Sequence, residues 1–339
     1  MMRLPRFEVL FPATVEEACT FLDKHGPQAR VMGGGTDIIP AAKLGNIQPT
    51  CVISLKGIHG LKGVTYQEKE GLTIGALTPL VLLRQDAFIR GHYQALAQAA
   101  SVVGSPQIQR MGTLGGNLCL DTRCYFYNQS SSWRRHRPVC FKMGGDVCHV
   151  VPKGKRCHAA FSADTPSALI ALNAKVKLVS SKGTRLISVG DLYTGDGKEP
   201  MALRPGEVLT EIQLPPITHQ VSVYLKYRIR KAIDFPLVGV AVQIARNGKE
   251  DGCDQAKIVL TAVGPGPVEV FEAEALLNQA SLSKEVIKKA TEMAIHVAHP
   301  VPNIGSTPTY RRKMVGILIQ KVLSQLVKEM VLGGGKGVG

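Results

Sequence analysis

The chain lacks any apolar stretch that approaches the roughly 20 residues needed to cross a bilayer, and its first residues lack the apolar core of a signal peptide. Aromatic residues make up only 5% of the sequence, with a single tryptophan, and no recognised nucleic-acid-binding motif is present. These absences weigh against a membrane protein, an exported protein and a nucleic-acid-binding protein. We therefore expect a cytoplasmic protein that contacts neither membrane nor nucleic acid.

Length and positive charge are what the chain does have. Its 339 residues are 45% hydrophobic, and the usual domain size of about 100 to 200 residues predicts two domains. The net charge of +15, from 41 basic and 26 acidic residues, favours anionic partners such as phosphates or acidic proteins. The pair Pro215 and Pro216 predicts a boundary between a first domain, 1–218, and a second, 219–332, before a disordered tail at 333–339.

The hydrophobic pattern predicts helices and strands in both halves. A helix over 14–25 opens with Thr14 as its cap and with Glu16 and Glu17 in its first turn. Other first-half elements are expected as strands over 29–32, 51–55 and 72–76 and a helix over 93–103, before an apolar pattern over 167–178. Second-half elements are expected as strands over 224–230, 239–245 and 257–263 and helices over 269–279, 283–298 and 310–331.

Two glycine-rich segments have the composition of phosphate-binding loops. The first, 33–37, follows a short apolar strand, and the second is 112–117. Glycines there let successive backbone amides approach a phosphate closely. Neither segment has the spacing of the dinucleotide fingerprint or the lysine of a P-loop. Each segment alone is compatible with a simple tight turn, but together they indicate a clamp for one diphosphate.

The eight cysteines, in a chain without an export signal, indicate reduced thiols or metal ligands. Four of them, Cys124, Cys140, Cys148 and Cys157, are separated by 15, 7 and 8 residues and match the usual count for an iron–sulfur cluster. Structural zinc sites take ligand pairs only two to four residues apart, which this set lacks. Zinc and buried free cysteine remain the alternatives.

The four cysteines lie in a polar, irregular segment, 119–160, that is long for a loop without a function. Between positions 123 and 158 it has one acidic residue, Asp146, and eight basic ones: Arg123, Arg134, Arg135, Arg137, Lys142, Lys153, Lys155 and Arg156. We hypothesise a basic docking surface for ferredoxin, against the alternative of a solvated face without a partner. Of the other cysteines, Cys19 and Cys51 are expected in the core and Cys253 on an exposed loop, whereas Cys119 is left open.

The two glycine segments also carry a family resemblance. The runs 31–38 and 112–118 resemble the two FAD-binding loops of the flavoprotein part of molybdenum hydroxylases, the xanthine dehydrogenase and carbon monoxide dehydrogenase group. The likeness extends over nearly the whole chain, through the segments 162–169, 206–209, 225–228 and 234–236. One departure lies before the second loop, where family members often read Gln-Ile-Arg-Asn and this chain has Gln-Ile-Gln-Arg at 107–110.

The resemblance implies an α+β fold. A two-part FAD-binding domain of the vanillyl-alcohol-oxidase (PCMH) type with a Cys-rich cluster-binding insertion at 119–160 precedes a smaller α/β C-terminal domain of the CO dehydrogenase flavoprotein type. No catalytic residue is implied on this chain, because the flavin supplies the redox chemistry. The implied FAD contacts are Val31, Met32, Gly33, Gly34, Gly35, Thr36, Asp37, Ile38, Thr113, Leu114, Gly115, Gly116, Asn117, Asp164, Leu209 and Lys226.

The insertion is similar to that of the family members that reduce 4-hydroxybenzoyl-CoA. This resemblance implies a [4Fe-4S] cluster on Cys124, Cys140, Cys148 and Cys157, with ferredoxin as electron donor. It also implies a molybdenum-cofactor large subunit and a [2Fe-2S] small subunit in a dimer of heterotrimers. The alternatives are the FAD subunit of an oxidising molybdenum hydroxylase and, more distantly, a zinc-stabilised nucleic-acid-binding protein.

Overall fold

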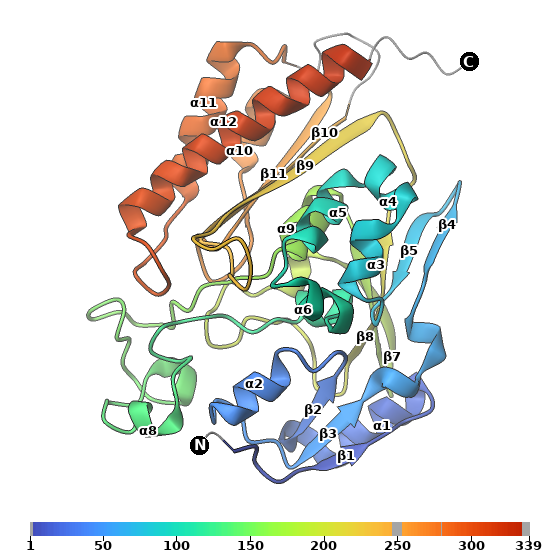
Figure 1. Cartoon of the computed structure of the whole chain (residues 1–339), viewed down its shortest axis with the longest axis vertical. Helices are drawn as coiled ribbons and strands as arrows, with labels where there is room; N and C mark the ends of the chain where they lie inside the picture. The colour runs from blue at the N-terminus through green and yellow to red at the C-terminus, as the bar shows by residue number, and fades with distance from the viewer. Residues whose placement is uncertain (1–2, 246–252, 279, 334–339) are drawn as a thin grey trace.

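The computed structural model describes residues 3–245, 253–278 and 280–333, which form three β-sheets with helices packed around them (Figure 1). The sheets follow one another along the molecule, from the N-terminal sheet at one end to the C-terminal sheet and its helices at the other. None of the helices within these ranges combines the length and the apolar character needed to cross a membrane.

The first sheet is parallel, with the order β1-β3-β2. Its strands are β1 (Glu8–Leu10), β2 (Ala29–Met32) and β3 (Cys51–Ser54), and α1 (Val15–His25) connects the first two. The predicted cap is confirmed, because the Thr14 hydroxyl accepts a hydrogen bond from the Glu17 amide. The first glycine loop leaves the carboxyl end of β2 and leads into α2 (Ile38–Lys43), so that this sheet positions the loop.

The second sheet has five strands in the order β4-β5-β8-β6-β7, all antiparallel. They are β4 (Val64–Gln67), β5 (Gly71–Gly75), β6 (Lys175–Ser180), β7 (Gly183–Ser188) and β8 (Val208–Leu214). Helices inserted between β5 and β6 share its core: α3 (Leu80–Gln85), α4 (Ala87–His92), α5 (Gln94–Ser101), α7 (Leu114–Leu118) and α9 (Thr165–Ala171). A further helix of this stretch, α6 (Pro106–Met111), packs on α3.

The third sheet is antiparallel, with the order β12-β11-β10-β9. Its strands are β9 (Gln220–Tyr227), β10 (Val238–Ala245), β11 (Gln255–Thr261) and β12 (Val268–Glu269). Three helices pack against it and enclose its core: α10 (Phe271–Leu277), α11 (Lys284–Val297) and α12 (Pro308–Gly333) (Figure 1). Helices α5 and α9 also contact this sheet, which joins it to the second sheet.

Several sequence predictions need correction. The strand expected over 224–230 begins at Gln220 and ends at Tyr227, and the apolar run 167–178 divides between α9 and β6. Cys19 and Cys51 are buried as predicted, but the prediction of an exposed Cys253 was wrong. That side chain is fully buried because it packs into the core that the third sheet shares with its helices. The predicted tail lies outside the described residues except for Gly333, which ends α12.

The segment 119–160 has little regular structure and projects from the body of the molecule, where Figure 1 labels α8. It contains the short helix α8 (Ser131–Arg134) and a 3₁₀ turn, Phe141–Met143. Its base is closed by two backbone hydrogen bonds of 2.7 Å, in which Arg123 and Ala160 each donate to the other's carbonyl. We call this segment the cluster loop.

Candidate cofactor-binding site

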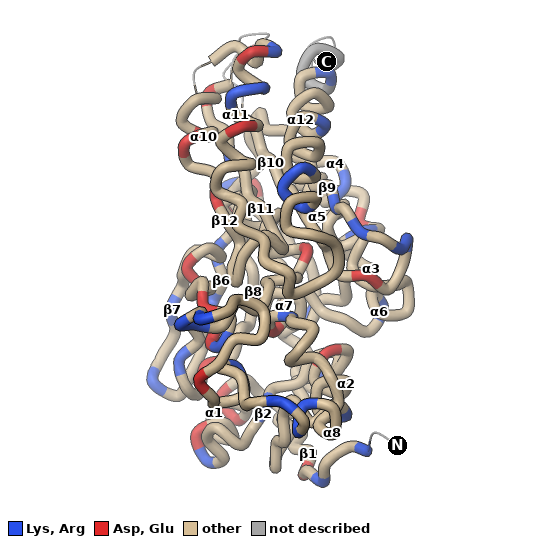
Figure 2. Tube along the Cα trace, turned by 90° about the vertical axis from the view of Figure 1, so that its left-hand side faces the viewer, with Lys and Arg blue, Asp and Glu red and all other residues tan. Residues whose placement is uncertain are grey.

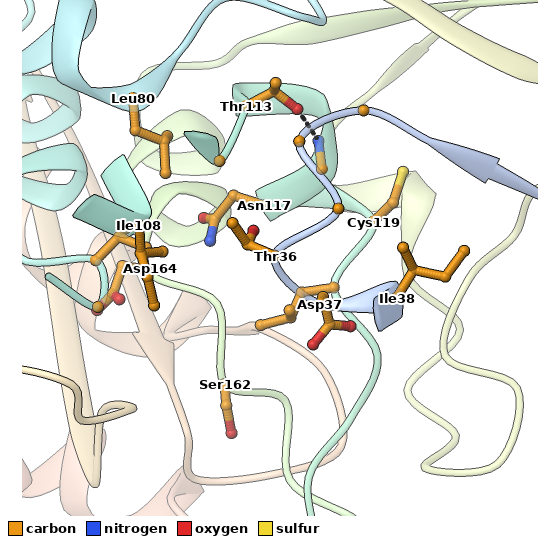
Figure 3. A pocket seen from close by; sticks show the side chains of 18 of the residues that line it. Thr36, Asp37, Ile38, Leu80, Ile108, Thr113, Asn117, Cys119, Ser162 and Asp164 are labelled. Atoms are coloured by element: carbon orange, nitrogen blue, oxygen red, sulfur yellow. Dashed lines mark hydrogen bonds between the residues drawn. The ribbon is translucent and has the colours of Figure 1, made fainter. Parts of the chain in front are cut away.

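The two glycine loops lie side by side around a cavity of about 240 Å³ (Figure 3). The first loop contributes every residue from Val31 to Ile38, and the second contributes Gly112, Thr113, Gly116 and Asn117. Segments about eighty positions apart in the sequence are thus brought to one site, as the clamp hypothesis predicts.

Glycine is required where the loops touch. A Cβ atom on Gly34 would lie 1.8 Å from the carbonyl oxygen of Met111, and one on Gly33 would lie 2.9 Å from the Thr113 hydroxyl. Gly35 has a φ of 78°, in the left-handed region that favours glycine. The backbone of the first loop is therefore held against the second loop by contacts that a larger residue would prevent.

Unused backbone donors make this cavity suitable for an anion. Within the described chain, the amides of Gly34, Gly35 and Thr36 donate to no protein group. In the second loop, by contrast, the Gly116 amide donates a hydrogen bond of 3.1 Å to the Thr113 hydroxyl, which fixes the conformation of that loop (Figure 3). Successive free amides on a glycine loop bind phosphate oxygens. The loops therefore fit a diphosphate group such as that of FAD.

A buried polar network lies at one end of the cavity. The Asp164 carboxylate lines the cavity and accepts hydrogen bonds from the Tyr224 hydroxyl at 2.7 Å and from the Lys226 ammonium at 2.9 Å. Burial raises the pKa of Asp164 and lowers the pKa of Lys226, while the attraction between the two charges opposes both shifts. The Asn117 side chain also lines the cavity and accepts from Thr165, so both polar groups have fixed orientations.

Some predicted FAD contacts do not reach the cavity wall. Leu114, Gly115, Leu209 and Lys226 lie behind it, with Leu209 in the core of the second sheet, and direct contact between them and FAD stays a prediction. Cys119, which the sequence left open, lines the cavity, and burial raises the pKa of its thiol to about 12.

Sequence reasoning also missed part of the lining. The missed side chains come from α3, from the stretch around α6, and from two loops, and they are Leu80, Val103, Gly104, Ile108, Leu120, Ser162, Ile233, Asp234 and Phe235. The Asp-Phe-Pro motif at 234–236 was a usable signal, because it belonged to the family resemblance. Ile108 lies in the stretch that departs from the family pattern, yet it faces the cavity (Figure 3).

The four predicted metal ligands gather at a second, small cavity of about 20 Å³. Cys124, Cys140, Cys148 and Cys157 all line it, and each is partly buried. The Val151 amide donates to the Cys148 sulfur at 3.4 Å. Burial raises the pKa of the Cys124 and Cys157 thiols, and nearby backbone groups of Phe126, Tyr127 and Ala159 oppose that increase. Such N–H···S hydrogen bonds stabilise thiolates and set the potential of cysteine-bound clusters.

Buried positive charge lies beside the cysteines. The Lys142 ammonium is almost completely buried and bonds Asp121 and Thr122, each at 2.7 Å. It lies 5.0 Å from the centroid of the Tyr127 ring, another side chain of the cysteine cavity. Burial raises the pKa of the Cys157 thiol to about 11, an effect that the Ala159 amide and the Lys142 charge oppose. The Lys142 ammonium and the Ala159 amide therefore favour a negatively charged sulfur at this site.

The two cavities are joined through Arg123. This residue directly precedes Cys124, and its guanidinium pairs with Asp37 of the first glycine loop and stacks 4.8 Å from the Phe235 ring centroid. Burial lowers the pKa of Arg123 to about 10, and its Nε atom is buried without a hydrogen-bond partner among the described residues. Asp37 and Phe235 both line the larger cavity, so Arg123 lies between the two sites.

The cluster loop also packs on the residues that directly follow α2, a helix that begins at the larger cavity. The Arg134 guanidinium donates to the Asn46 side chain at 3.0 Å and to the Gly45 carbonyl at 2.8 Å. Asn46 in turn donates to the Tyr127 carbonyl at 2.9 Å. One short helix therefore separates the glycine loop from the loop that carries the cysteines.

The chain matches known families over most of its length. Residues 5–217 match the family described as the FAD-binding domain in molybdopterin dehydrogenase, and residues 223–326 match the CO dehydrogenase flavoprotein C-terminal domain. A chain of reconstituted CO dehydrogenase from Oligotropha carboxidovorans superposes with a TM-score of 0.79 at 26% identity, covering 96% of this chain and 99% of that chain. The α+β fold class predicted from the resemblance is confirmed.

Curated relatives cover the chain at low to moderate identity. The aldehyde oxidoreductase FAD-binding subunit PaoB of Escherichia coli is 31% identical, over 75% of this chain and 81% of the relative. The carbon monoxide dehydrogenase medium chain of Afipia carboxidovorans is 27% identical, over 94% and 96%. The xanthine dehydrogenase FAD-binding subunit of Escherichia coli O157:H7 is 24% identical, over 96% of both chains.

Proposed function

Since this chain belongs to the family of FAD-binding subunits of molybdopterin-dependent dehydrogenases, we propose that it holds FAD between its two glycine loops and transfers electrons within a molybdenum enzyme. The observation that supports the binding mode is the pair of loops in contact around one cavity, with three free amides on the first loop. When bound, FAD exchanges two electrons and also passes them singly.

The residues of this chain bind and orient the cofactor. The amides of Gly34, Gly35 and Thr36 hold the diphosphate, while the carboxylate of Asp164 is fixed by Tyr224 to accept from a polar group of the cofactor. Apolar side chains from both proposed domains, 1–218 and 219–332, exclude water: Leu80, Val103, Ile108, Leu120, Ile233 and Phe235.

The cluster loop holds a [4Fe-4S] cluster on its four cysteines. This part of the proposal rests on their convergence at one cavity and on the Val151 amide, which donates to the Cys148 sulfur. Among the described residues, no group of three His, Cys, Asp or Glu side chains is placed to hold a metal ion. The preference for an iron–sulfur cluster over zinc rests on the sequence, where the four cysteines lack the close ligand pairs of structural zinc sites.

The proposal also covers the reaction that the complete enzyme catalyses. The cluster loop favours the beta subunit of a 4-hydroxybenzoyl-CoA reductase, in which ferredoxin supplies the electrons for reductive removal of the phenolic hydroxyl. The molybdenum cofactor is then held by a large subunit and [2Fe-2S] clusters by a small subunit, in a dimer of heterotrimers. A second candidate is an oxidising dehydrogenase, and the names of the relatives support it: xanthine, carbon monoxide and nicotinate dehydrogenase subunits.

The first test is the cofactor content of the protein. Anaerobic purification followed by iron, sulfide, zinc and flavin analysis should give about four irons, about four sulfides and one FAD per chain, with an EPR signal after dithionite reduction. Cys124→Ser should lower the iron content and keep FAD, whereas Cys19→Ser, a change in the core of the first sheet, should keep the iron. Zinc without flavin would contradict both parts of the proposal.

The second test separates the two candidate reactions. The complete complex is assayed with 4-hydroxybenzoyl-CoA and a reduced donor, and in parallel with xanthine, aldehydes, carbon monoxide and nicotinate in the presence of an oxidised acceptor. Formation of benzoyl-CoA supports the reductase. Oxidation of one of the other substrates, without dehydroxylation, supports the oxidising dehydrogenase.

A further inference from the structure

The outer face of the cluster loop forms a surface whose position and chemistry indicate a protein partner. We propose that it is the docking site of a small acidic protein that carries one electron at a time, and that the electron crosses the wall of the cysteine cavity at Phe126, Cys140 and His149. This inference rests on the proposed function, because it assigns an entry route to the cluster. We call the surface the electron port, defined by Phe126, Trp133, Arg135, Arg137, Val139, Met143 and His149.

The position of the port is set by two adjoining cavities. A cavity of about 290 Å³ opens between α8, the residues after it, and the end of α2. It shares Phe126, Cys140 and His149 with the cysteine cavity. A group seated in the outer cavity is therefore separated from the cysteine cavity only by the side chains of these shared residues. The Phe126 and His149 rings are in contact, with centroids 5.2 Å apart, so the wall is continuous.

The charge of the port is uncompensated. Three of the eight basic residues of the cluster loop serve internal contacts: Arg123 with Asp37, Arg134 with backbone carbonyls, and Lys142 with Asp121. Arg135 and Arg137 are exposed and have no ion pair with any acidic residue in the described ranges. No acidic residue lines the outer cavity. Figure 2 shows Lys and Arg beside α8. This surface attracts an acidic partner.

The port also exposes apolar and aromatic surface. Val139 is 56% exposed and Met143 is 38% exposed. The Arg137 guanidinium lies 4.4 Å from the Trp133 ring centroid and 5.6 Å from that of Phe126, which pre-orders the cation on an aromatic base. Arg, Trp and Met enriched around an apolar centre are typical of protein interfaces rather than of solvated surface. A small inorganic anion would use the charge but not this apolar area.

A second basic group on the same loop offers a matched comparison. Lys153, Lys155 and Arg156 are exposed and also have no described ion pair, but none of them lines either the outer cavity or the cysteine cavity. They contribute the same sign of charge without access to the shared wall. The port is therefore distinguished by its position and not by charge alone.

The test compares two double variants of the holo-complex that remove the same charge. One is Arg135→Gln with Arg137→Gln, and the other is Lys153→Gln with Lys155→Gln. Anaerobic stopped-flow measures the rate of reduction by a reduced acidic [2Fe-2S] ferredoxin as a function of ionic strength, with dithionite as a small-molecule reductant. The port variant should be about tenfold slower with ferredoxin at low salt and should depend less on salt, while dithionite reduction is unchanged. The control should change by about twofold or less.

Several outcomes would overturn the proposal. Equal slowing in the control variant would mean that the loop attracts its partner by general charge, without a port. A rate that is unchanged in the port variant, or insensitive to salt in the native complex, would remove electrostatic docking altogether.

Failure of the port variant to assemble with the other subunits would assign this face to a subunit interface. The single variant Arg135→Gln would then be measured, because that side chain makes no hydrogen bond or ion pair with a described residue. No slowing of ferredoxin reduction in that variant would end the proposal. A native protein without iron would instead refute the proposed function itself.

Discussion

The contact between the two glycine loops gives a quantitative prediction for Gly34→Ala. The added Cβ would lie 1.8 Å from the Met111 carbonyl oxygen and 2.6 Å from its carbonyl carbon, whereas ordinary contacts begin at 3.4 Å. Since both neighbours are backbone atoms, no side chain can rotate away and the loops must separate by about 1.6 Å. Overpacking of this kind costs about 1 to 3 kcal/mol, and a backbone clash belongs at the upper end.

The same geometry ranks two further variants. Gly33→Ala meets the Thr113 hydroxyl at 2.9 Å, and because a side chain can adjust, we expect a loss of about 1 kcal/mol. Gly91→Ala has no atom within 4 Å of the new Cβ and lies in α4, so it should leave the cavity unchanged and stabilise the helix by up to about 1 kcal/mol.

The assay is titration of the apo-protein with FAD, followed by fluorescence quenching, together with urea unfolding of each variant. A separation of the loops that costs about 3 kcal/mol should weaken FAD binding by about 100-fold in Gly34→Ala, with about fivefold in Gly33→Ala and no change in Gly91→Ala. If Gly34→Ala binds FAD within about threefold of the native protein, the loops do not form the cofactor site and the reasoning is wrong.

Three other perturbations test the buried polar network, a buried arginine and the partly buried ion pair of Arg185 with Glu207. Asp164→Asn should destabilise the fold by about 3 to 5 kcal/mol because it leaves the Lys226 ammonium buried without its counter-charge, and adding Lys226→Met should recover part of that loss in urea unfolding. Arg311→Met should cost about 3 kcal/mol, since the fully buried guanidinium donates to three backbone carbonyls; thermal unfolding measures this, and a shift no larger than that of a surface change would contradict it. Burial acts to raise the pKa of Glu207, but the hydrogen bonds from Arg185 and from the Arg204 amide, together with the positive charges of both arginines, outweigh it, so the pKa lies below its ordinary value. The stabilisation that this ion pair gives the fold is therefore present above the unfolded-state pKa of about 4.3 and is lost as the pH falls through the lower folded-state pKa. Glu207→Gln should flatten the pH dependence of the free energy of unfolding between these two pKa values.

Local requirements were readable from the amino-acid sequence. The glycines at 33–35 follow a short apolar strand because that turn needs a backbone without side chains, and a pattern of this kind is visible without any partner. The Thr14 cap and the strands around Val31 and Val240 were found for the same reason, since caps and apolar periodicity are properties of consecutive residues. The four cysteines were recognisable as candidate ligands because their residue type, number and spacing can be read without knowing the fold.

Long-range contacts were not readable in this way. The four-residue β4 and the six-residue α2 are too short to establish a hydrophobic period, although β4 forms an edge of the second sheet and α2 follows the first glycine loop. Nothing in the sequence paired Asp164 with Lys226, 62 positions away, or predicted that Arg311 would be completely buried against backbone carbonyls. The Asp164–Lys226 pair and the burial of Arg311 both depend on which charged groups become inaccessible to water when distant segments pack together.

The sequence by itself therefore determined which chemical groups the chain can offer: two glycine loops, four closely grouped thiols and an excess of positive charge. Only the tertiary structure decided that Gly34 touches Met111, that Arg123 joins the two cavities, and that Phe126, Cys140 and His149 separate the cysteines from an exposed basic surface. The physical reason is that residue type sets what a group can bind, whereas burial and proximity arise when distant segments pack together.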